Sequence, residues 1–242
     1  MLSPARGSSP HRKKPRRQVP ASDDELRRAA ALTPRLEAWF ESHGREFPWR
    51  AWHDPFRITI AELLLQRTRA SVVAGFIPGF LRRFPTWESF HQADESELSD
   101  VMKPIGLYRQ RAGVLKRVAA EIAGSTGVDA GWSPNIGQYV ERAVRVMAHG
   151  ERLAMVDSNF VRAIKRLFGG SWMSDYRYDL RLQGIAQALV DGSADARVLN
   201  WAILDLGSLV CKPHTPACQD CPVSAGCVFL SLHPVQNFRR RP

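Results

Sequence analysis

Apolar residues recur at helical spacing in three segments of the C-terminal half, residues 138–149, 158–168 and 195–210. Positions i, i+3, i+4 and i+7 of a helix share one face, so this spacing predicts three amphipathic helices. The apolar residues on these faces are Val140, Ala143, Val144 and Met147 in the first segment, Phe160, Ile164 and Leu167 in the second, and Leu199, Ile203 and Leu206 in the third. Gly150 and Gly169 directly follow the first two segments, where glycine favours a helix end.

Helical patterns also fill the N-terminal half of the chain. Ser22 is a predicted N-cap, and Glu25, three residues later, completes a capping box. Residues 58–74, ITIAELLLQRTRASVVA, are apolar enough to form one buried helix. Strand-like alternation and Asn-Gly hairpin turns are absent from the sequence, and no segment repeats another. We therefore predict an all-α protein built of short helices.

The composition is that of a globular protein, with 44% hydrophobic residues in a chain of 242. No apolar run approaches the roughly 18 residues that a membrane helix needs, so no membrane partner is expected. The N-terminal stretch also lacks the apolar centre of a secretory signal. We therefore expect a location in the cytoplasm or nucleoid, or in the nucleus of a eukaryote. Disulfides are rare in these compartments, so clustered cysteines are expected to bind metal.

The net charge of +10 is concentrated in two tails. Residues 1–20 contain six Lys or Arg and no acid, and residues 239–241 are all arginine. Such tails often bind nucleic acid or act as a nuclear address, because they attract phosphates without sequence preference. A solvated arm that only aids solubility is an equally good interpretation. Residues 1–22 have few apolar side chains and are predicted to be a disordered basic tail.

All four cysteines lie within residues 211–227, CKPHTPACQDCPVSAGC. Zinc sites usually combine two close cysteine pairs across a longer loop, whereas here only one close pair occurs. A compact loop with four thiolates suits an iron–sulfur cluster better. Zinc is the main alternative, and disulfides are a weaker one. The ligands in either metal site would be Cys211, Cys218, Cys221 and Cys227.

This cysteine spacing, directly after the helical stretch NWAILDLGSLVC, resembles the endonuclease III and adenine glycosylase superfamily. These proteins are helix-hairpin-helix base-excision DNA glycosylases with a [4Fe–4S] loop. The resemblance runs from about residue 36 to residue 229. It implies an all-α fold of two lobes, with double-stranded DNA in the cleft between them, and a [4Fe–4S] cofactor.

The resemblance also implies a division of the chain. One lobe is expected to be contiguous, and the other to join the N-terminal helix to the C-terminal helices. The expected segments are a disordered basic tail (1–22), an N-terminal helix of the cysteine-bearing lobe (23–54), a helical lobe with a hairpin at 133–139 (55–157), C-terminal helices (158–210), the cluster loop (211–227) and a basic C-terminal tail (228–242).

The stretch SPNIGQYVERAV, residues 133–144, resembles the hairpin of this family. A tight turn before a helix points backbone N–H groups outward, where a DNA phosphate can bind. Gly137 matches the family's final glycine, whereas Asn135 replaces the first glycine and Ser133 replaces a leucine. Asparagine tolerates positive φ, so the turn itself is expected to persist. Any Pro-Asn-x-Gly turn would look similar. The motif indicates the family hairpin because it lies at the right distance before the next family motif.

The next motif is MVDSNFVRAIKRLFGG, in which Asp157 matches the family's catalytic aspartate. Cleavage of a glycosidic bond leaves positive charge on the sugar, and a carboxylate stabilises that charge and helps to deliver water. The alternative is that Asp157 only caps the helix that starts at Ser158. Both roles are compatible, and the helix dipole is expected to keep the carboxylate ionised.

The residue at position 139 bears on the type of reaction. Family members that also cut the DNA strand carry a lysine there, which forms a Schiff base with the sugar. Tyr139 cannot form an imine, and Lys165 on the next helix occupies no position that the family uses. The resemblance therefore implies a monofunctional glycosylase that leaves an abasic site. A half-buried packing role for Tyr139 is compatible with this prediction.

The segment PWR…DPFRI…AELLLQRT resembles both adenine glycosylases and mismatch thymine glycosylases, and Glu62 occupies a pocket position in both. In adenine enzymes this residue protonates the purine, whereas beside a pyrimidine it would read the edge of the base. A solvent-facing helix residue is the alternative. Gln66-Arg67-Thr68 and Ser158-Asn159-Phe160-Val161-Arg162 look closer to the thymine type. The chain also ends soon after the cysteines, where adenine enzymes commonly add a further domain.

The stretch IGLYRQRA, residues 105–112, resembles the loop whose leucine enters the base stack when the target base is extruded. Leu107 is the predicted wedge, Gln66 the predicted filler of the vacated space, and Arg67 a further DNA contact. Each could instead belong to the core or surface. Lys212, between two cysteine ligands, is expected to contact the DNA backbone.

Together these features predict a monomeric DNA glycosylase of base excision repair. It would hydrolyse the N-glycosidic bond of mismatched thymine, and also uracil, opposite guanine, with Asp157, Tyr139 and Glu62 as catalytic residues. Removal of adenine opposite guanine or 8-oxoguanine is the enzymatic alternative. A non-catalytic iron–sulfur DNA-binding protein is the alternative of another class.

Overall fold

The computed structural model describes residues 19–124 and 136–233. This part of the chain contains helices and no strand, so the predicted all-α class is confirmed. The α-helices are α1 (Asp23–His43), α2 (Pro55–Leu65), α3 (Ala70–Arg83), α4 (Trp87–Gln92), α5 (Glu95–Met102), α6 (Tyr108–Gly124), α7 (Gln138–His149), α8 (Ser158–Phe168), α9 (Leu180–Asp191), α10 (Ala196–Leu209) and α11 (Val228–Leu232). Short 3₁₀ turns are η1 (Pro48–Ala51), η2 (Lys103–Ile105), η4 (Tyr176–Tyr178) and η5 (Cys218–Asp220).

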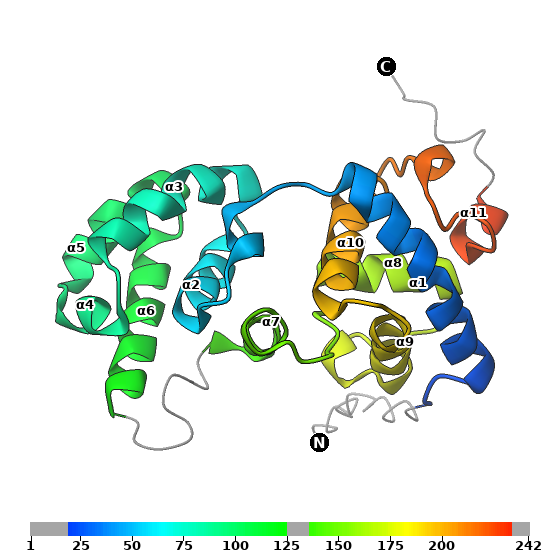
Figure 1. Ribbon diagram of the computed structural model, residues 1–242, viewed down its shortest axis with the longest axis horizontal. Coiled ribbons are helices and arrows are strands. Elements are labelled where there is room, and N and C mark those ends of the chain that lie inside the picture. The colour runs from blue at the N-terminus through cyan, green and yellow to red at the C-terminus, as the bar shows by residue number, and fades with distance from the viewer. Residues whose placement is uncertain (1–18, 125–135, 234–242) are drawn as a thin grey trace, which may run out of the picture.

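The helices form two lobes, each around its own apolar core (Figure 1). The middle lobe contains α2 to α6, whereas the terminal lobe contains α1 and α8 to α11. Within the terminal lobe α1 packs against α9 and α10, so segments from opposite ends of the sequence share one core. The predicted two-lobed fold is confirmed, and the predicted boundaries at residues 54/55 and 157/158 stay a prediction.

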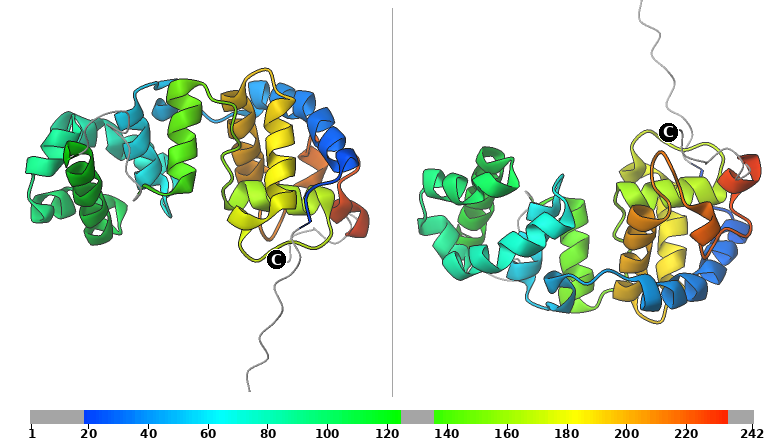
Figure 2. Two further views of the ribbon diagram at one scale, coloured as in Figure 1. Left: turned by 90° about the horizontal axis from the view of Figure 1, so that it is seen from below. Right: turned by 90° about the horizontal axis from the view of Figure 1, so that it is seen from above.

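Helix α7 lies between the lobes, as both views of Figure 2 show. Its buried side chains divide between the two cores: Val140 belongs to the middle lobe, while Ala143 and Met147 belong to the terminal lobe. Tyr139, in the first turn, packs against both. The amphipathic pattern therefore predicts the helix correctly, and its buried face turns out to serve two cores.

The predicted helix ends are largely confirmed. Ser22 caps α1 by accepting a hydrogen bond from the Glu25 N–H at 3.3 Å, and the Glu25 carboxylate accepts from the Ser22 N–H at 3.0 Å. Gly150 ends α7 in the left-handed conformation, with φ 70°, and Gly169 ends α8 with φ 61°. These caps satisfy backbone groups that a helix leaves unpaired.

The prediction of one helix over residues 58–74 is wrong. Helix α2 ends at Leu65, and α3 begins at Ala70. Arg67, in the turn between the two helices, has a φ of 59°. Residues 66–69 are all polar, but they carry no glycine or proline, so no local signal marks the end of the helix. The carbonyls of Leu64 and Gln66 accept hydrogen bonds from a side chain distant in sequence, Arg111, and this tertiary contact stabilises the early end of α2.

The connection between α1 and α2 links the lobes through one buried carboxylate. Asp205 of α10, whose side chain is fully buried, accepts hydrogen bonds from Arg45 Nε at 2.8 Å and from Arg50 Nη2 at 2.8 Å. Trp49, next to Arg50, packs into the middle-lobe core. Neighbouring residues are thus attached to opposite lobes, which helps to fix the cleft between them. None of the described helices is long and apolar enough to cross a membrane.

Candidate active site

A cleft of about 660 Å³ opens between the lobes, and both lobes contribute its walls. Glu62 from α2, Tyr139 from α7 and Asp157 at the start of α8 all line it. The structure therefore brings together three residues that are 95 positions apart at the extremes of the sequence. Arg50 and Trp201 line the same cleft.

Glu62 is 5% exposed, so the alternative of a solvent-facing helix residue is wrong. Its carboxyl group hydrogen-bonds the hydroxyl of Tyr139. The pKa of Glu62 is raised to about 7, first by burial and second by the charge of Asp157, against the opposing hydrogen bond from Tyr139 and charge of Arg50. At neutral pH this group is therefore divided between its acid and its base form.

Asp157 is the N-cap of α8, as the structural alternative predicts. Its Oδ1 accepts from the Phe160 N–H at 2.7 Å, and its Oδ2 accepts from Asn159 Nδ2 at 2.9 Å. Burial raises the pKa of Asp157, while these hydrogen bonds and the charge of Arg162 act in the opposite direction. Desolvation outweighs these favourable contacts in the direction of the shift, and the expectation that the helix dipole keeps the carboxylate ionised stays a prediction.

Tyr139 is half-buried between the two carboxyl groups. Burial and the charges of Glu62 and Asp157 raise the pKa of the phenol well above its ordinary value. The phenol therefore stays protonated at neutral pH, and its O–H can donate to a carboxylate. The packing role suggested for this residue is confirmed, since it contacts both cores.

Two cleft residues escaped the sequence analysis as individual site residues. Among the described residues, the buried side-chain nitrogens without a hydrogen-bond partner are Arg50 Nε and Trp201 Nε1. The guanidinium of Arg50 lies 5.4 Å from the centre of the Trp201 ring. Both atoms are buried, and a buried donor without a partner is costly, so these two residues of the cleft wall are polar groups that the fold leaves unsatisfied. No sequence pattern signals these two atoms, and only the folded structure shows that they lack hydrogen-bond partners.

The predicted DNA contacts of the middle lobe gather at the rim of the cleft. Gln66 and Arg67 are exposed in the turn between α2 and α3 and line the cleft. Leu107 lies across a second groove that it shares with both residues. Its side chain is 36% exposed and its φ is 50°, so an apolar side chain is held outward at the cleft edge.

The remaining predicted DNA contacts are spread over the two lobes. Gly137 is exposed directly before α7, with φ 80°, a conformation that suits glycine. Asn135 lies outside the described residues. Lys212 is exposed in the cysteine loop, and its carbonyl accepts a hydrogen bond from Arg166.

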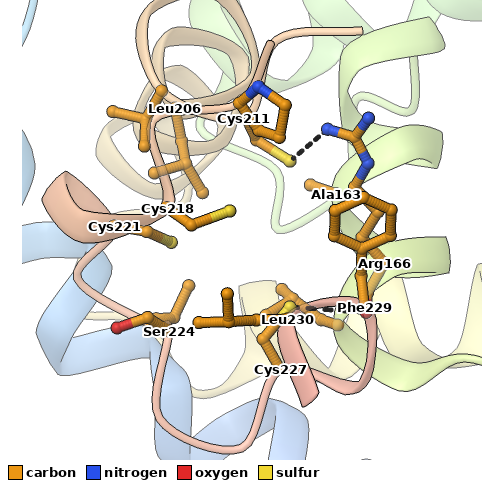
Figure 3. Close-up of a pocket in the computed structure, with 14 residues that line it drawn as sticks. Ala163, Arg166, Leu206, Cys211, Cys218, Cys221, Ser224, Cys227, Phe229 and Leu230 are labelled. Atoms are coloured by element: carbon orange, nitrogen blue, oxygen red, sulfur yellow. Dashed lines mark hydrogen bonds between the residues drawn. The ribbon is translucent and has the colours of Figure 1, made fainter. Parts of the chain in front are cut away.

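The four cysteines line one pocket between α8, the end of α10 and α11 (Figure 3). All four are free thiols, so the disulfide interpretation is not supported. Arg166 of α8 donates to Cys211 Sγ at 3.3 Å, and its carbonyl accepts from Cys227 Sγ at 3.5 Å. Burial raises the pKa of Cys221 to about 11. Within the described residues no three His, Cys, Asp or Glu side chains are grouped as ligands of a single metal ion.

Comparison with known proteins places this arrangement in a family. Residues 60–199 match the HhH-GPD superfamily base excision DNA repair protein family. The match spans more than half of the chain, and the protein belongs to this family. The resemblance read from the cysteine spacing and the hairpin is thereby confirmed.

Individual relatives show which members of the family the chain is similar to. The chain is 35% identical to the thymine/uracil-DNA glycosylase of Methanothermobacter thermautotrophicus over 192 residues, which cover 76% of this chain and 86% of that protein. A solved structure of a thermostable thymine-DNA glycosylase has a TM-score of 0.78 at 32% identity, over 87% of this chain and 100% of that one. The adenine DNA glycosylase of Homo sapiens is 26% identical, over 84% of this chain and 40% of the human protein.

Proposed function

We propose that this protein is a monofunctional DNA glycosylase that removes thymine, and uracil, opposite guanine and leaves an abasic site. The observation that carries the proposal is the convergence of Glu62, Tyr139 and Asp157 in one cleft between the lobes. The names of the relatives described above support the choice of base. The protein acts as a monomer on double-stranded DNA that carries the mismatched base.

Asp157 is the catalytic carboxylate in this proposal. As the bond between the sugar C1′ and the base nitrogen breaks, its charge stabilises the positive charge that develops on the sugar. A water molecule then adds to C1′, and one of its protons leaves with the departing base. Asn159 and the Phe160 N–H hold both carboxylate oxygens, so the group needs little reorganisation during the reaction.

The composition of the cleft supports simple hydrolysis. The described residues that line it include no lysine, and Tyr139 occupies the position where a Schiff base would require one. A test is Tyr139→Lys. We expect this variant to gain strand cleavage that borohydride can trap as a covalent complex, since Tyr139 faces the same cavity as Asp157. Absence of trapping in a folded variant would contradict the placement of the sugar beside residue 139.

The polar groups of the cleft match a pyrimidine edge. Thymine and uracil present a carbonyl, an N–H and a second carbonyl in sequence, which calls for donor, acceptor and donor groups. A base that enters the cleft would have to uncover the buried Arg50 Nε and Trp201 Nε1 to use them as donors, whereas the ionised form of Glu62 supplies an acceptor. A pyrimidine leaves as an anion, and hydrogen bonds to its oxygens stabilise that charge.

The second candidate is an adenine glycosylase, because one observation favours it. Glu62 has a pKa of about 7, so the acid form needed to protonate a departing purine is well populated at neutral pH. Base release from duplexes with G·T, G·U, A·G and A·8-oxoguanine pairs separates the candidates. We expect release from G·T and G·U only. Activity confined to adenine would replace the first proposal with the second, and binding without any release would favour a non-catalytic DNA-binding protein.

We also propose that Cys211, Cys218, Cys221 and Cys227 hold a [4Fe–4S] cluster. Four thiols that share one pocket, without forming the close ligand set of a single ion, suit a cluster in which each iron has its own cysteine. When bound, such a cluster supplies a structural crosslink and a one-electron redox centre, neither of which hydrolysis consumes. Assay of the purified protein for iron, sulfide and zinc distinguishes the cluster from a zinc site.

The predicted DNA contacts complete the proposed interface. Gln66, Arg67 and Leu107 contact the DNA at the extruded base, where a wedge side chain offsets part of the unstacking cost. Asn135 and Gly137 bind a phosphate at the start of α7, and Lys212 binds the backbone beside the cysteine loop.

A further inference from the structure

The guanidinium group of Arg111, in the first turns of α6, is buried without a carboxylate partner. The side chain belongs to a residue only 7% exposed, and its hydrogen bonds go to neutral oxygens. These bonds run from Nη1 to the carbonyls of Ile105 (3.0 Å) and Gly106 (2.6 Å), and from Nη2 to the carbonyls of Leu64 (2.9 Å) and Gln66 (2.7 Å) and to Thr68 Oγ1 (2.6 Å). Burying a charge in this way is costly, and five acceptors offset the cost.

The five acceptors belong to two separate turns. Leu64, Gln66 and Thr68 surround the break between α2 and α3, while Ile105 and Gly106 end η2 just before α6. One planar guanidinium group therefore links two loops about forty residues apart in sequence. Arginine suits this position because its donors are held in a rigid fork, whereas the single ammonium of lysine reaches fewer acceptors.

Each of these turns contains a strained residue. Among the described residues, Arg67 and Leu107 are the non-glycine positions with positive φ, at 59° and 50°. This conformation is unfavourable for a side-chain-bearing residue and persists only where neighbouring structure imposes it. The hydrogen bonds of Arg111 lie on both sides of Arg67 and directly before Leu107, so they are well placed to impose it.

The same turns carry the residues that face the DNA in the proposed function. Gln66, Arg67 and Leu107 line one groove of about 280 Å³ together with Arg111, and Gln66 also lines the catalytic cleft. Extruding a base is unfavourable because stacking is lost, and side chains that enter the stack offset this cost only if they arrive at the correct spacing. A rigid link between the two turns supplies that spacing before DNA binds.

We infer that Arg111 is a positioning residue that ties the Gln66 turn to the Leu107 turn, so that both side chains enter the gap left by one extruded base. This inference rests on the proposed glycosylase function. Arg111 itself contacts neither base nor sugar. A purely structural role, as a cap for the C-terminal ends of α2 and η2, would affect folding without coupling Gln66 to Leu107.

Base extrusion is measured directly in an Asp157→Asn background, where DNA is bound and not processed. The probe is a duplex with 2-aminopurine next to the target thymine, whose fluorescence rises when its neighbour leaves the stack. With Arg111→Met, we expect the extrusion equilibrium to fall roughly tenfold while DNA affinity changes by less than about threefold. For Arg111→Lys we expect an extrusion equilibrium between that of the protein with Arg111 and that of the Arg111→Met variant. An Arg111→Met protein that extrudes the base normally would overturn the inference.

Arg152 offers a matched control. Its guanidinium also caps a helix end through backbone carbonyls, those of Val190 at 2.7 Å and Ser193 at 2.8 Å, but it lies in the terminal lobe. Arg152→Met should leave extrusion unchanged, whatever it does to the thermal midpoint. If extrusion falls equally in the Arg152 and Arg111 variants, the effect is general destabilisation and the inference fails.

A double-mutant cycle keeps the test decisive if Arg111→Met does not fold. The substitutions Gln66→Ala and Leu107→Ala affect exposed residues and are made alone and together, with Arg111 and with Arg111→Lys. We expect a coupling of roughly tenfold between them when arginine is present and little coupling with lysine. Equal coupling in both backgrounds would refute the link. Failure of the wild type to release any base from G·T or G·U duplexes would instead refute the proposed function.

Discussion

Helix α8 contributes residues to both the cleft and the cysteine pocket, and the two sites differ in the chemistry of their side chains. Asp157 begins the helix in the cleft, while Arg166, more than two turns later, faces the cysteines. The cleft contains ionisable groups whose pKa values burial has moved toward neutrality, together with unpaired donors. The cysteine pocket is lined mainly by apolar side chains and thiols. Carboxyl groups whose pKa values are shifted toward neutrality favour the cleft as the site of chemistry, whereas thiols whose pKa values are raised away from it, such as that of Cys221, fit a supporting role.

The sharpest test of this contrast is Asp157→Asn. Asparagine also caps helices well, so α8 should remain folded while the stabilising charge is lost. We expect single-turnover base release to fall roughly 10³-fold, with DNA binding retained. Asp195→Asn is the matched control, since Asp195 is the N-cap of α10 outside the cleft. Normal base release by the Asp157 variant would move the chemistry elsewhere.

Cys221→Ala tests the other side of the comparison. Because metal binding contributes directly to folding free energy, we expect a loss of iron and a decrease of several kcal/mol in the free energy of unfolding. The protein that remains folded should release base at a rate within about twofold of the wild type. Ser224→Ala, in the same pocket, should keep its iron. A folded, iron-bearing protein whose catalysis alone is lost would contradict a supporting role.

Glu62→Gln tests the pH dependence that is expected from the buried carboxyl group in the cleft. The folded-state pKa of Glu62, about 7, exceeds the ordinary value near 4.5. The wild-type protein is therefore most stable at low pH, where this carboxyl group is protonated, and its free energy of unfolding falls as pH rises. Relative to the variant, we expect the wild type to lose about 3 kcal/mol of stability between about pH 4.5 and pH 7, seen in urea unfolding across that range. Base release by the wild type should also rise through pH 7, as Glu62 ionises to accept the pyrimidine N–H. A pH-independent stability difference would mean that Glu62 is not buried as described.

The smallest expected effect concerns strain at the rim of the cleft. Leu107→Gly and Leu107→Ala both remove the apolar wedge, but only glycine relieves the positive φ. We expect both to slow base release similarly, and the glycine variant to be more stable than the alanine variant by about 1 kcal/mol in chemical denaturation. Equal stability would indicate that residue 107 carries no strain.

Prediction from sequence succeeds where the physical cause is local. The period of apolar residues indicates α7, α8 and α10, and Ser22 with Glu25 marks the start of α1, because one turn of helix contains all the groups involved. The cysteine spacing and the motif around Asp157 indicate the family for the same reason. The break after Leu65 goes undetected because the donor that completes it, Arg111, is more than forty residues away.

Sequence alone therefore determined the all-α class, the family and the residue types at the proposed catalytic positions. Only the tertiary structure decided how those residues behave. It buried Glu62 beside Asp157 and Tyr139, which moved the carboxyl pKa to about 7, and it left Arg50 and Trp201 with unpaired donors. It also joined two strained turns through Arg111. Burial, desolvation and long-range hydrogen bonding depend on which segments meet in space, and no local pattern of residues encodes that meeting.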